Sequence, residues 1–185
     1  MVRKGFVSLE KYGFIINQRT RKDWASSKKI WTRKKVADAL VQAKNLLPPG
    51  FNLLILDGKR SIEDQRRIIK ICEKDFKNRD PQNWRQMLKD FTGGYEILKQ
   101  RKFSPMSHLG GGAVDLTIVD DRGKELDMGG DTFDEREALN YYEKKKRLSK
   151  REKEIKENRR LLKKVMVKAG FKPYPKEWIH WGYKK

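Results

Sequence analysis

Ser107-His108-Leu109-Gly110-Gly111-Gly112-Ala113-Val114-Asp115-Leu116-Thr117-Ile118-Val119 is the stretch of this 185-residue chain that best indicates how it folds. In its second half, apolar side chains recur at every second position: Val114, Leu116 and Ile118. An extended strand places these side chains on one face, and it places Asp115 on the opposite, more polar face. The glycines before the strand predict a tight turn, which would let His108 and Asp115 approach each other.

Predicted helices and strands follow one another along the rest of the chain. Residues 51–56 are apolar apart from Asn52, and this run stops at Asp57-Gly58, which is typical of a buried strand that ends in a turn. Ser61 followed by Asp64 is typical of a helix N-terminus. The other expected elements are a strand at 14–16, a helix with Thr32 as its N-cap, a helix after Pro81, a helical region at 135–169 ended by Gly170, and an extended segment at 176–183. No internal repeat or flexible linker separates them, so we expect one domain over residues 1–185.

Charge is the most unusual property of the composition. The chain has 45 Lys and Arg against 25 Asp and Glu, a formal net charge of +20. Such a balance is found in proteins that bind nucleic acid, an anionic membrane or another polyanion. Here the basic residues are spread along the chain and mixed with acidic ones, and aromatic residues do not interleave a basic patch. We therefore expect a generally basic surface and no specific nucleic-acid partner.

Two further features concern the location of the protein. Cys72 is the single cysteine, so the chain cannot form an internal disulfide. The first ten residues lack the apolar run of a signal peptide. No stretch approaches the roughly 20 apolar residues that span a bilayer. The sequence therefore predicts a cytoplasmic protein without a membrane partner, and it leaves the oligomeric state open.

The two histidines of the chain, His108 and His180, both lie beside carboxylates. A catalytic zinc site commonly uses three His or carboxylate ligands and leaves one position for water. His108, Asp115 and His180 would provide such a set, and we expect them to bind one Zn²⁺ per chain. The alternative is that either histidine, taken alone, is incidental.

Glu177 is the candidate general base. A metal-dependent amide hydrolase needs a group that takes a proton from water and later passes it to the leaving amine. In a flat strand, residues three apart point to opposite faces, so Glu177 and His180 would diverge. We expect a bulge or bend next to Pro175 to bring them to one face. Otherwise Glu177 is an exposed surface acid.

Arg60 is the candidate for stabilising the negative charge that develops on a substrate oxygen. An arginine in so basic a chain is most often a surface residue. Arg60 stands out because it follows the predicted strand end at Asp57-Gly58. Asp57 would either hold Arg60 in place or cap the turn.

These motifs together resemble the zinc D-Ala-D-Ala dipeptidases of the VanX type, within the zinc D,D-peptidases of the Hedgehog-like fold. The matching pieces are, in chain order, Asp57-Gly58-Lys59-Arg60, His108-x-x-Gly111-x-Ala113-x-Asp115, Gly129 with Phe133-Asp134, and Glu177-Trp178-Ile179-His180. The resemblance covers residues 5–183.

The resemblance implies a small α+β domain with a central, mainly antiparallel sheet flanked by helices. It assigns five residues to the metal and the chemistry: His108, Asp115 and His180 as zinc ligands, Glu177 as general base and then acid, and Arg60 as the group that stabilises the transition state. It also implies that Asp134 meets the free amino group of a dipeptide and that Ser107 helps to bind the substrate.

The chain departs from the family pattern near the substrate positions. Met106 stands two residues before the first histidine, where the family usually has a serine, so Ser107 is the nearest match. Lys59 and Ser61 replace the aromatic residue and the proline that often flank the arginine. These differences leave the metal chemistry intact and bear on the identity of the substrate.

The expected function is zinc-dependent hydrolysis of the D-alanyl-D-alanine dipeptide by a metal-activated water with Glu177 as the base. The alternative is a related zinc D,D- or L,D-peptidase, or an endolysin, that acts on peptidoglycan peptides. A basic surface would suit an anionic cell wall, whereas the missing secretion signal counts against that role. A nucleic-acid-binding protein is a third hypothesis, which rests on charge alone.

Overall fold

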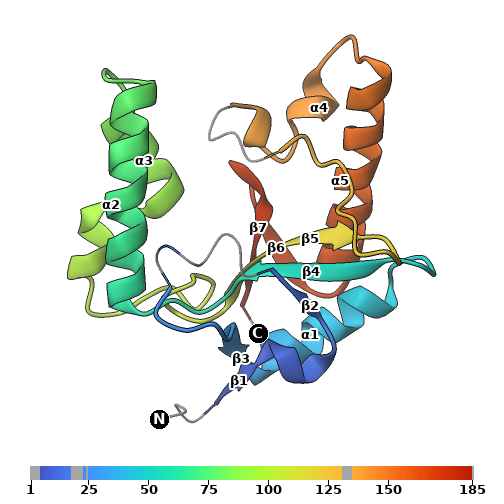
Figure 1. The fold of residues 1–185 in the computed structure, drawn as a ribbon, viewed down its shortest axis with the longest axis horizontal. Coiled ribbons are helices and arrows are strands. Elements are labelled where there is room, and N and C mark those ends of the chain that lie inside the picture. Colours follow the sequence, from blue (N-terminus) through green and yellow to red (C-terminus); the bar gives the residue numbers. More distant parts are fainter. Residues whose placement is uncertain (1–4, 18–22, 24, 131–134, 185) are drawn as a thin grey trace.

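The computed structural model describes residues 5–17, 23, 25–130 and 135–184. Within these ranges a five-stranded sheet runs through the middle of the molecule (Figure 1). Its strand order is β2 (Ile15–Ile16), β4 (Asn52–Asp57), β5 (Ala113–Val119), β7 (Glu177–Tyr183) and β6 (Phe171–Tyr174). β2 is parallel to β4, and the other neighbouring pairs are antiparallel. The predicted α+β architecture with a mainly antiparallel central sheet is therefore confirmed.

The helices lie around this sheet in separate groups. They are α1 (Lys34–Asn45), α2 (Ile62–Arg79), α3 (Trp84–Thr92), α4 (Tyr141–Lys144) and α5 (Lys150–Lys168), with short 3₁₀ segments at Leu9–Tyr12, Tyr95–Lys99 and Glu135–Glu137. α2 and α3 stand together on one side, and α4 and α5 on the other (Figure 1). A two-stranded ladder of β1 (Phe6–Ser8) and β3 (Trp31–Arg33) lies near α1. None of the helices in the described ranges is long and apolar enough to cross a bilayer.

The main core lies between one face of the sheet and helices α1 and α5. The alternating residues of β5 are fully buried in it, as the sequence predicts: Val114, Leu116 and Ile118. Facing them are side chains of α1 and α5: Val36, Leu40, Ala43, Leu162, Val165 and Met166. Burial of one large apolar side chain contributes about 1.5–3 kcal/mol. This face of β5 is thus committed to the core, and Asp115 faces away from it.

Helix α2 begins where the sequence predicts. Oγ of Ser61 accepts a hydrogen bond from the amide of Asp64 (3.0 Å), and the Asp64 carboxylate accepts one from the amide of Ser61 (3.3 Å). This reciprocal cap satisfies two amides that a helix start leaves without partners. It also fixes the backbone directly after Arg60.

The prediction that Thr32 is the N-cap of α1 is wrong. Thr32 lies in β3, where it pairs with Val7 of β1, and its hydroxyl donates to the carbonyl oxygen of Gly111 (3.1 Å). Helix α1 begins at Lys34 instead, after Arg33. Thr32 has the residue type of a cap, but its hydroxyl is used to join the β1–β3 ladder to the glycine loop.

The continuous helical region expected at 135–169 is interrupted. Helix α4 ends at Lys144, and α5 starts at Lys150 behind Ser149. Ser149 and Glu152 form a second reciprocal cap, which starts α5. The dense charge pattern of this region does not show the break, because charged residues occupy helices and their connections alike.

Candidate active site

Three adjacent strands carry the polar residues of the site in one row. Asp57 of β4 pairs with Asp115 of β5, and Asp115 pairs with His180 of β7. Residues that pair across antiparallel strands point to the same face of the sheet. The row therefore brings side chains from three distant parts of the sequence onto the face opposite the main core.

Asp57 reaches this face because β4 is irregular at its end. Leu53 and Ile55 point into the main core, and strict alternation would send Asp57 there as well. The register with β5 shifts between Ile55 and Asp57, so that Leu56 is passed over. Such a bulge reverses the direction of the next side chain. It turns Asp57 from the core towards the site.

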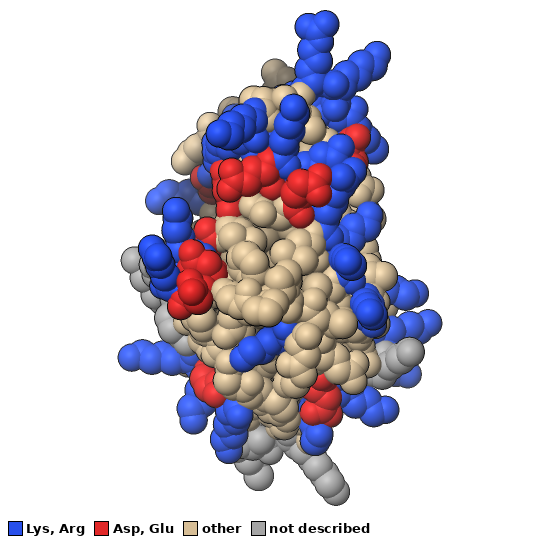
Figure 2. Space-filling model, turned by 90° about the vertical axis from the view of Figure 1, so that its right-hand side faces the viewer, with Lys and Arg blue, Asp and Glu red and all other residues tan. Residues whose placement is uncertain are grey.

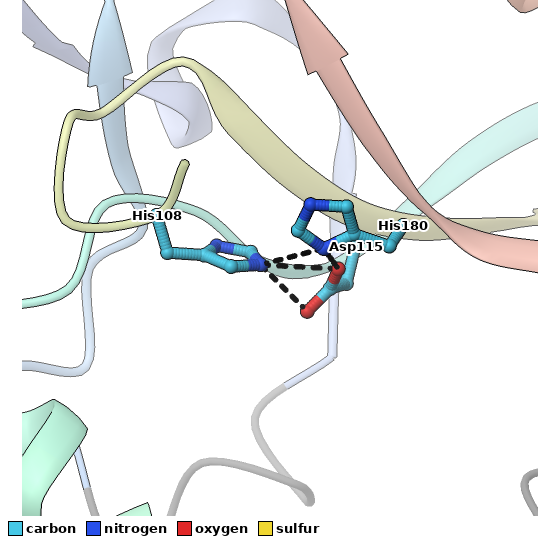
Figure 3. Close-up of side chains that lie close together, drawn as sticks. All are labelled: His108, Asp115 and His180. Carbon is cyan, nitrogen blue, oxygen red and sulfur yellow. Dashed lines mark hydrogen bonds and ion pairs between the residues drawn. The ribbon is translucent and has the colours of Figure 1, made fainter. Parts of the chain in front are cut away.

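His108, Asp115 and His180 point towards one another (Figure 3). Nε2 of His108 lies 3.1 Å from Nδ1 of His180 and 3.2 Å from Oδ1 of Asp115. Nδ1 of His180 lies 3.0 Å from the same carboxylate oxygen. One donor atom of each residue lies within 4.8 Å of the others, so this group could hold a metal ion.

The protonation states of the group suit a metal. Nδ1 of His108 lies 2.6 Å from the carbonyl oxygen of Gly58, and donation there leaves the lone pair of Nε2 directed at the other two residues. Burial lowers the pKa of His180, which favours its neutral form. Burial acts to raise the pKa of Asp115, but the contacts with His108 and His180 hold it well below its usual range. A neutral His180 and an ionised Asp115 are the forms in which these two side chains bind metals.

The spacing of the donors agrees with zinc as the ion. Zinc binds nitrogen and oxygen donors at about 2.0–2.1 Å in tetrahedral geometry, which separates neighbouring donors by about 3.3 Å. The donor atoms of His108, Asp115 and His180 are 3.0–3.2 Å apart. The residues present therefore fit one small tetrahedral cation with a position left for another group.

The glycine loop allows His108 to approach Asp115. Gly111 has a φ of 76°, the left-handed region that glycine tolerates best. A Cβ atom at Gly112 would lie 1.9 Å from the carbonyl oxygen of Pro105. The sequence predicts the turn, and the structure shows that close backbone approach is a second reason for glycine here.

Glu177 and His180 face one cavity, as the expected bulge requires. Pro173 of β6 pairs with Trp181, but the next residue, Tyr174, pairs with Glu177, so residues 178–180 are passed over. This irregularity at the start of β7 confirms the predicted departure from a flat strand. Glu177, His180, His108 and Arg60 are among the residues that line a cavity of about 290 Å³.

Arg60 is held by polar partners on three sides. Its Nε donates to Oδ2 of Asp57 (2.6 Å), its Nη1 to Gln65 (3.2 Å) and its Nη2 to Oδ2 of Asp115 (3.2 Å). Burial opposes its charge, but the carboxylates of Asp57 and Asp115 raise its pKa, so the guanidinium stays protonated. Asp57 also accepts from the amide of Gly58 (2.7 Å), so it caps the turn and holds Arg60 at once.

The two expected substrate residues differ in what the structure says of them. Ser107 lines the same cavity, but its hydroxyl donates to the carbonyl oxygen of Ser104 (2.8 Å) and accepts from the amide of Gly110 (3.0 Å). These bonds stabilise the loop before His108. Asp134 lies outside the described residues.

Gln65 is a polar residue of the site that the sequence reading missed. It is 3% exposed, and it accepts from Arg60 while its amide donates to the carbonyl oxygen of Thr92 (2.9 Å). It thus ties Arg60 to the end of α3. A usable signal was its place one helical turn after Ser61, on the side of α2 that carries Ile69 into a buried cluster.

Comparisons with known proteins agree with this geometry. A family model described as D-ala-D-ala dipeptidase matches residues 5–185. The D-alanyl-D-alanine dipeptidase of Synechocystis sp. is 27% identical over an alignment of 148 residues, and the match covers 72% of this chain and 60% of that relative. The match thus spans less than two thirds of the relative's length. Because the family model covers nearly all of the sequence, the chain belongs to the D-Ala-D-Ala dipeptidase family of metallopeptidases.

Proposed function

We propose that this protein hydrolyses the D-alanyl-D-alanine dipeptide in a zinc-dependent reaction, with Glu177 as the general base. One observation carries the proposal: the donor group of His108, Asp115 and His180 lies against the cavity that Glu177 and Arg60 also line. Family membership supports the choice of substrate, since the matched relative is named for this dipeptide.

His108, Asp115 and His180 would hold the zinc ion. When bound, zinc supplies a Lewis acid that polarises the scissile carbonyl group and lowers the pKa of water. The carbonyl oxygen of Gly58 would keep the His108 ring in the orientation and tautomer that binding requires, because it accepts the proton on the opposite ring nitrogen.

Glu177 would carry the proton through the reaction. Its carboxylate takes a proton from water as the water oxygen forms a bond with the carbonyl carbon of the peptide. It then gives that proton to the amide nitrogen as the C–N bond breaks. The products are two molecules of D-alanine.

Arg60 would stabilise the negative charge that develops on the carbonyl oxygen. Its side chain is 13% exposed, and its guanidinium is oriented by Asp57 and Asp115 before any substrate arrives. A positive charge that is already in place needs no rearrangement during the reaction, and removal of one such group typically costs about 10²–10³-fold in rate.

The variant Glu177→Gln tests the proposal, because it keeps the shape of the side chain and removes the base. We expect kcat for D-Ala-D-Ala to fall by about 10²–10⁴-fold, with zinc content by metal analysis unchanged. The exposed Glu96→Gln serves as the matched control. Full activity of Glu177→Gln would remove Glu177 from the mechanism.

A substrate panel separates the free dipeptide from wall peptides. Hydrolysis of D,D-dipeptides but not of L,D- or L,L-dipeptides or peptidoglycan fragments is expected. Turnover of peptidoglycan fragments alone would favour the endolysin alternative.

Figure 2 shows basic side chains scattered over one face with acidic ones among them, which favours a generally basic surface over a nucleic-acid-binding patch. The cytoplasmic location stays a prediction.

A further inference from the structure

A second cavity, of about 680 Å³, lies beside the candidate active site. It is larger than the cavity of about 290 Å³ next to the metal donors. Arg60 and Leu109 border both, whereas the three metal donors and Glu177 are not among the described residues that line the larger one. Cavities of about 300–1,000 Å³ are typical of sites for small organic ligands. The reaction proposed above leaves this space without a role.

The loop after β4 forms a wall of both cavities. Towards the metal donors, the carbonyl oxygen of Gly58 lies 2.6 Å from Nδ1 of His108, and the amide of Arg60 donates to the carbonyl oxygen of His108 (3.1 Å). Between these two residues, the amide of Lys59 donates to the carbonyl oxygen of Trp31 (2.7 Å), and both Lys59 and Trp31 line the larger cavity. The hydrogen bonds of this loop therefore hold a fixed partition between the two spaces.

One part of the lining of the larger cavity is apolar and mainly aromatic. Its members are Phe6, Trp31, Ile62, Phe103 and Leu109. The ring of Phe6 is held against the glycine loop, where a Cβ atom at Gly111 would lie 2.3 Å from Cε1 of that ring. Trp31 is held in the β1–β3 ladder, opposite Ser8. Aromatic walls that are in place before a ligand arrives suit a flat apolar ligand.

Two lysines add positive charge to the same cavity. The ammonium group of Lys59 donates to the carbonyl oxygen of Arg60 (3.1 Å) and lies 5.3 Å from the centroid of the Phe6 ring. Lys29 also lines the cavity and is exposed. An ammonium group has three N–H donors and still attracts an anion while it holds a neutral carbonyl oxygen.

The carboxylates that line this cavity are bound by neighbouring groups. Oδ1 of Asp64 accepts from the amide of Ser26 (2.8 Å), and Oδ2 accepts from the hydroxyls of Ser26 (3.1 Å) and Ser61 (2.7 Å). The carboxylate of Glu63 forms an ion pair with Arg66. Because these negative charges are offset within the chain, the two lysines favour an anionic ligand over a cationic one.

We propose that this cavity is a separate binding site for an organic anion with a flat apolar body. The apolar body lies against the rings of Phe6, Trp31 and Phe103, and the anionic group binds the ammonium group of Lys59, with Lys29 as a second positive charge. The inference does not rest on the proposed function, because it concerns binding alone, in a space that the reaction does not use.

The probe for this site is anilinonaphthalene sulfonate, which combines an aromatic body with one sulfonate group. Its neutral counterpart, phenylnaphthylamine, has the same rings without the sulfonate. The fluorescence of both rises in an apolar site, so titration gives Kd. We expect the protein to bind one equivalent of the sulfonate, about tenfold more tightly than the neutral amine, as one charge-assisted hydrogen bond would give. Failure to bind either probe would refute the site.

The charge of Lys59 is tested by Lys59→Met, which keeps the straight apolar stem and removes the ammonium group. The variant should bind the sulfonate about tenfold more weakly and the neutral amine within about twofold of wild type. Lys29→Met should shift the preference in the same direction, and it decides the question if thermal unfolding shows that Lys59→Met does not fold. Lys168→Met, on the exposed side of α5, removes the same charge elsewhere and should change neither affinity.

The apolar wall is tested by Phe103→Ala. The loss of a ring that contacts the apolar body should weaken both probes by a similar factor, about 5- to 10-fold. Unchanged affinities of this variant would mean that the probes do not lie against Phe103, which contradicts the proposed placement.

Three other results would overturn the proposal. Several sulfonate molecules bound with the same affinity by the wild-type protein and both lysine variants would mean only adventitious attraction to a basic surface. Equal affinities for the two probes would remove the preference for an anion. Displacement of the sulfonate by D-Ala-D-Ala would mean that the cavity is part of the substrate site. Because no measurement requires turnover, this test stands even if the proposed function fails.

Discussion

Asp57→Asn separates the two roles that Asp57 could have in the site. Oδ1 of Asp57 accepts from the amide of Gly58 (2.7 Å), and Oδ2 accepts from Nε of Arg60 (2.6 Å). An asparagine can keep the first bond, but its amide group then presents a donor to the N–H of Arg60. If Asp57 only caps the turn, the substitution should leave the stability of the folded protein unchanged. If Asp57 holds Arg60, the substitution should lower that stability.

The size of the effect follows from the burial of the pair. The side chains of Arg60 and Asp57 are 13% and 5% exposed, so water screens their interaction only weakly. A hydrogen bond to a charged group contributes about 1.5–3 kcal/mol, and removal of one partner of a buried pair costs about 3–5 kcal/mol. Arg60 keeps Asp115 as a second partner at 3.2 Å. We therefore expect a loss of about 2–3 kcal/mol, which lowers Tm by about 4–12 °C for a domain of this size.

Thermal unfolding and kcat/KM for D-Ala-D-Ala measure the two consequences. Besides the fall in Tm, we expect kcat/KM to fall by about 10²-fold, since a small displacement of a group that stabilises the transition state has this effect. The matched control is Asp38→Asn, because Asp38 pairs with Lys34 on the surface with side chains 45% and 65% exposed. Such a pair contributes about 0.3–0.5 kcal/mol, so Tm of the control should change by no more than about 2 °C.

Each measurement can refute one part of the reasoning. Equal Tm values for Asp57→Asn and Asp38→Asn would mean that Asp57 acts only as a cap. A lower Tm with unchanged kcat/KM would mean that catalysis does not depend on how Asp57 orients Arg60.

Two further predictions concern the metal and the cap of α2. A chelator should lower Tm of the wild-type protein but not of His108→Ala. An ion that binds only the folded state adds about 4 kcal/mol to the free energy of unfolding when its concentration is a thousandfold above Kd. Equal responses of both proteins in thermal unfolding would contradict the metal site. Asp64 is buried, which acts to raise its pKa, but hydrogen bonds from Ser61 and Ser26 outweigh this and lower the pKa below its ordinary value. Because the folded pKa is the lower one, the stabilisation is present above about pH 4 and is lost as pH falls through the folded pKa. Asp64→Asn should lower the free energy of unfolding by about 1–2 kcal/mol at pH 7, and the variant should lose less stability than the wild-type protein on acidification. Urea unfolding at pH 7 and pH 3 measures both effects. The same acid dependence in both proteins would count against this role of Asp64.

Local patterns in the sequence determined several elements of this protein correctly. The alternation in 113–119 predicted β5 and its core face, and the Ser61–Asp64 pair predicted the start of α2. The residue types around His108 and His180 predicted a group that could hold a metal. These inferences hold because strand alternation, helix caps and the ligand chemistry of a side chain depend on a few neighbouring residues only.

The assembly of the site depends on contacts between distant parts of the chain, which no local pattern in the sequence reveals. Asp57 faces Asp115 because the ladder between β4 and β5 passes over Leu56, and Glu177 faces the cavity because β7 is irregular against β6. Thr32 looks like a cap in the sequence, but its partner is Gly111, far along the chain. Each of these features depends on partners distant in sequence, and register, bulges and buried hydrogen bonds exist only once those partners meet.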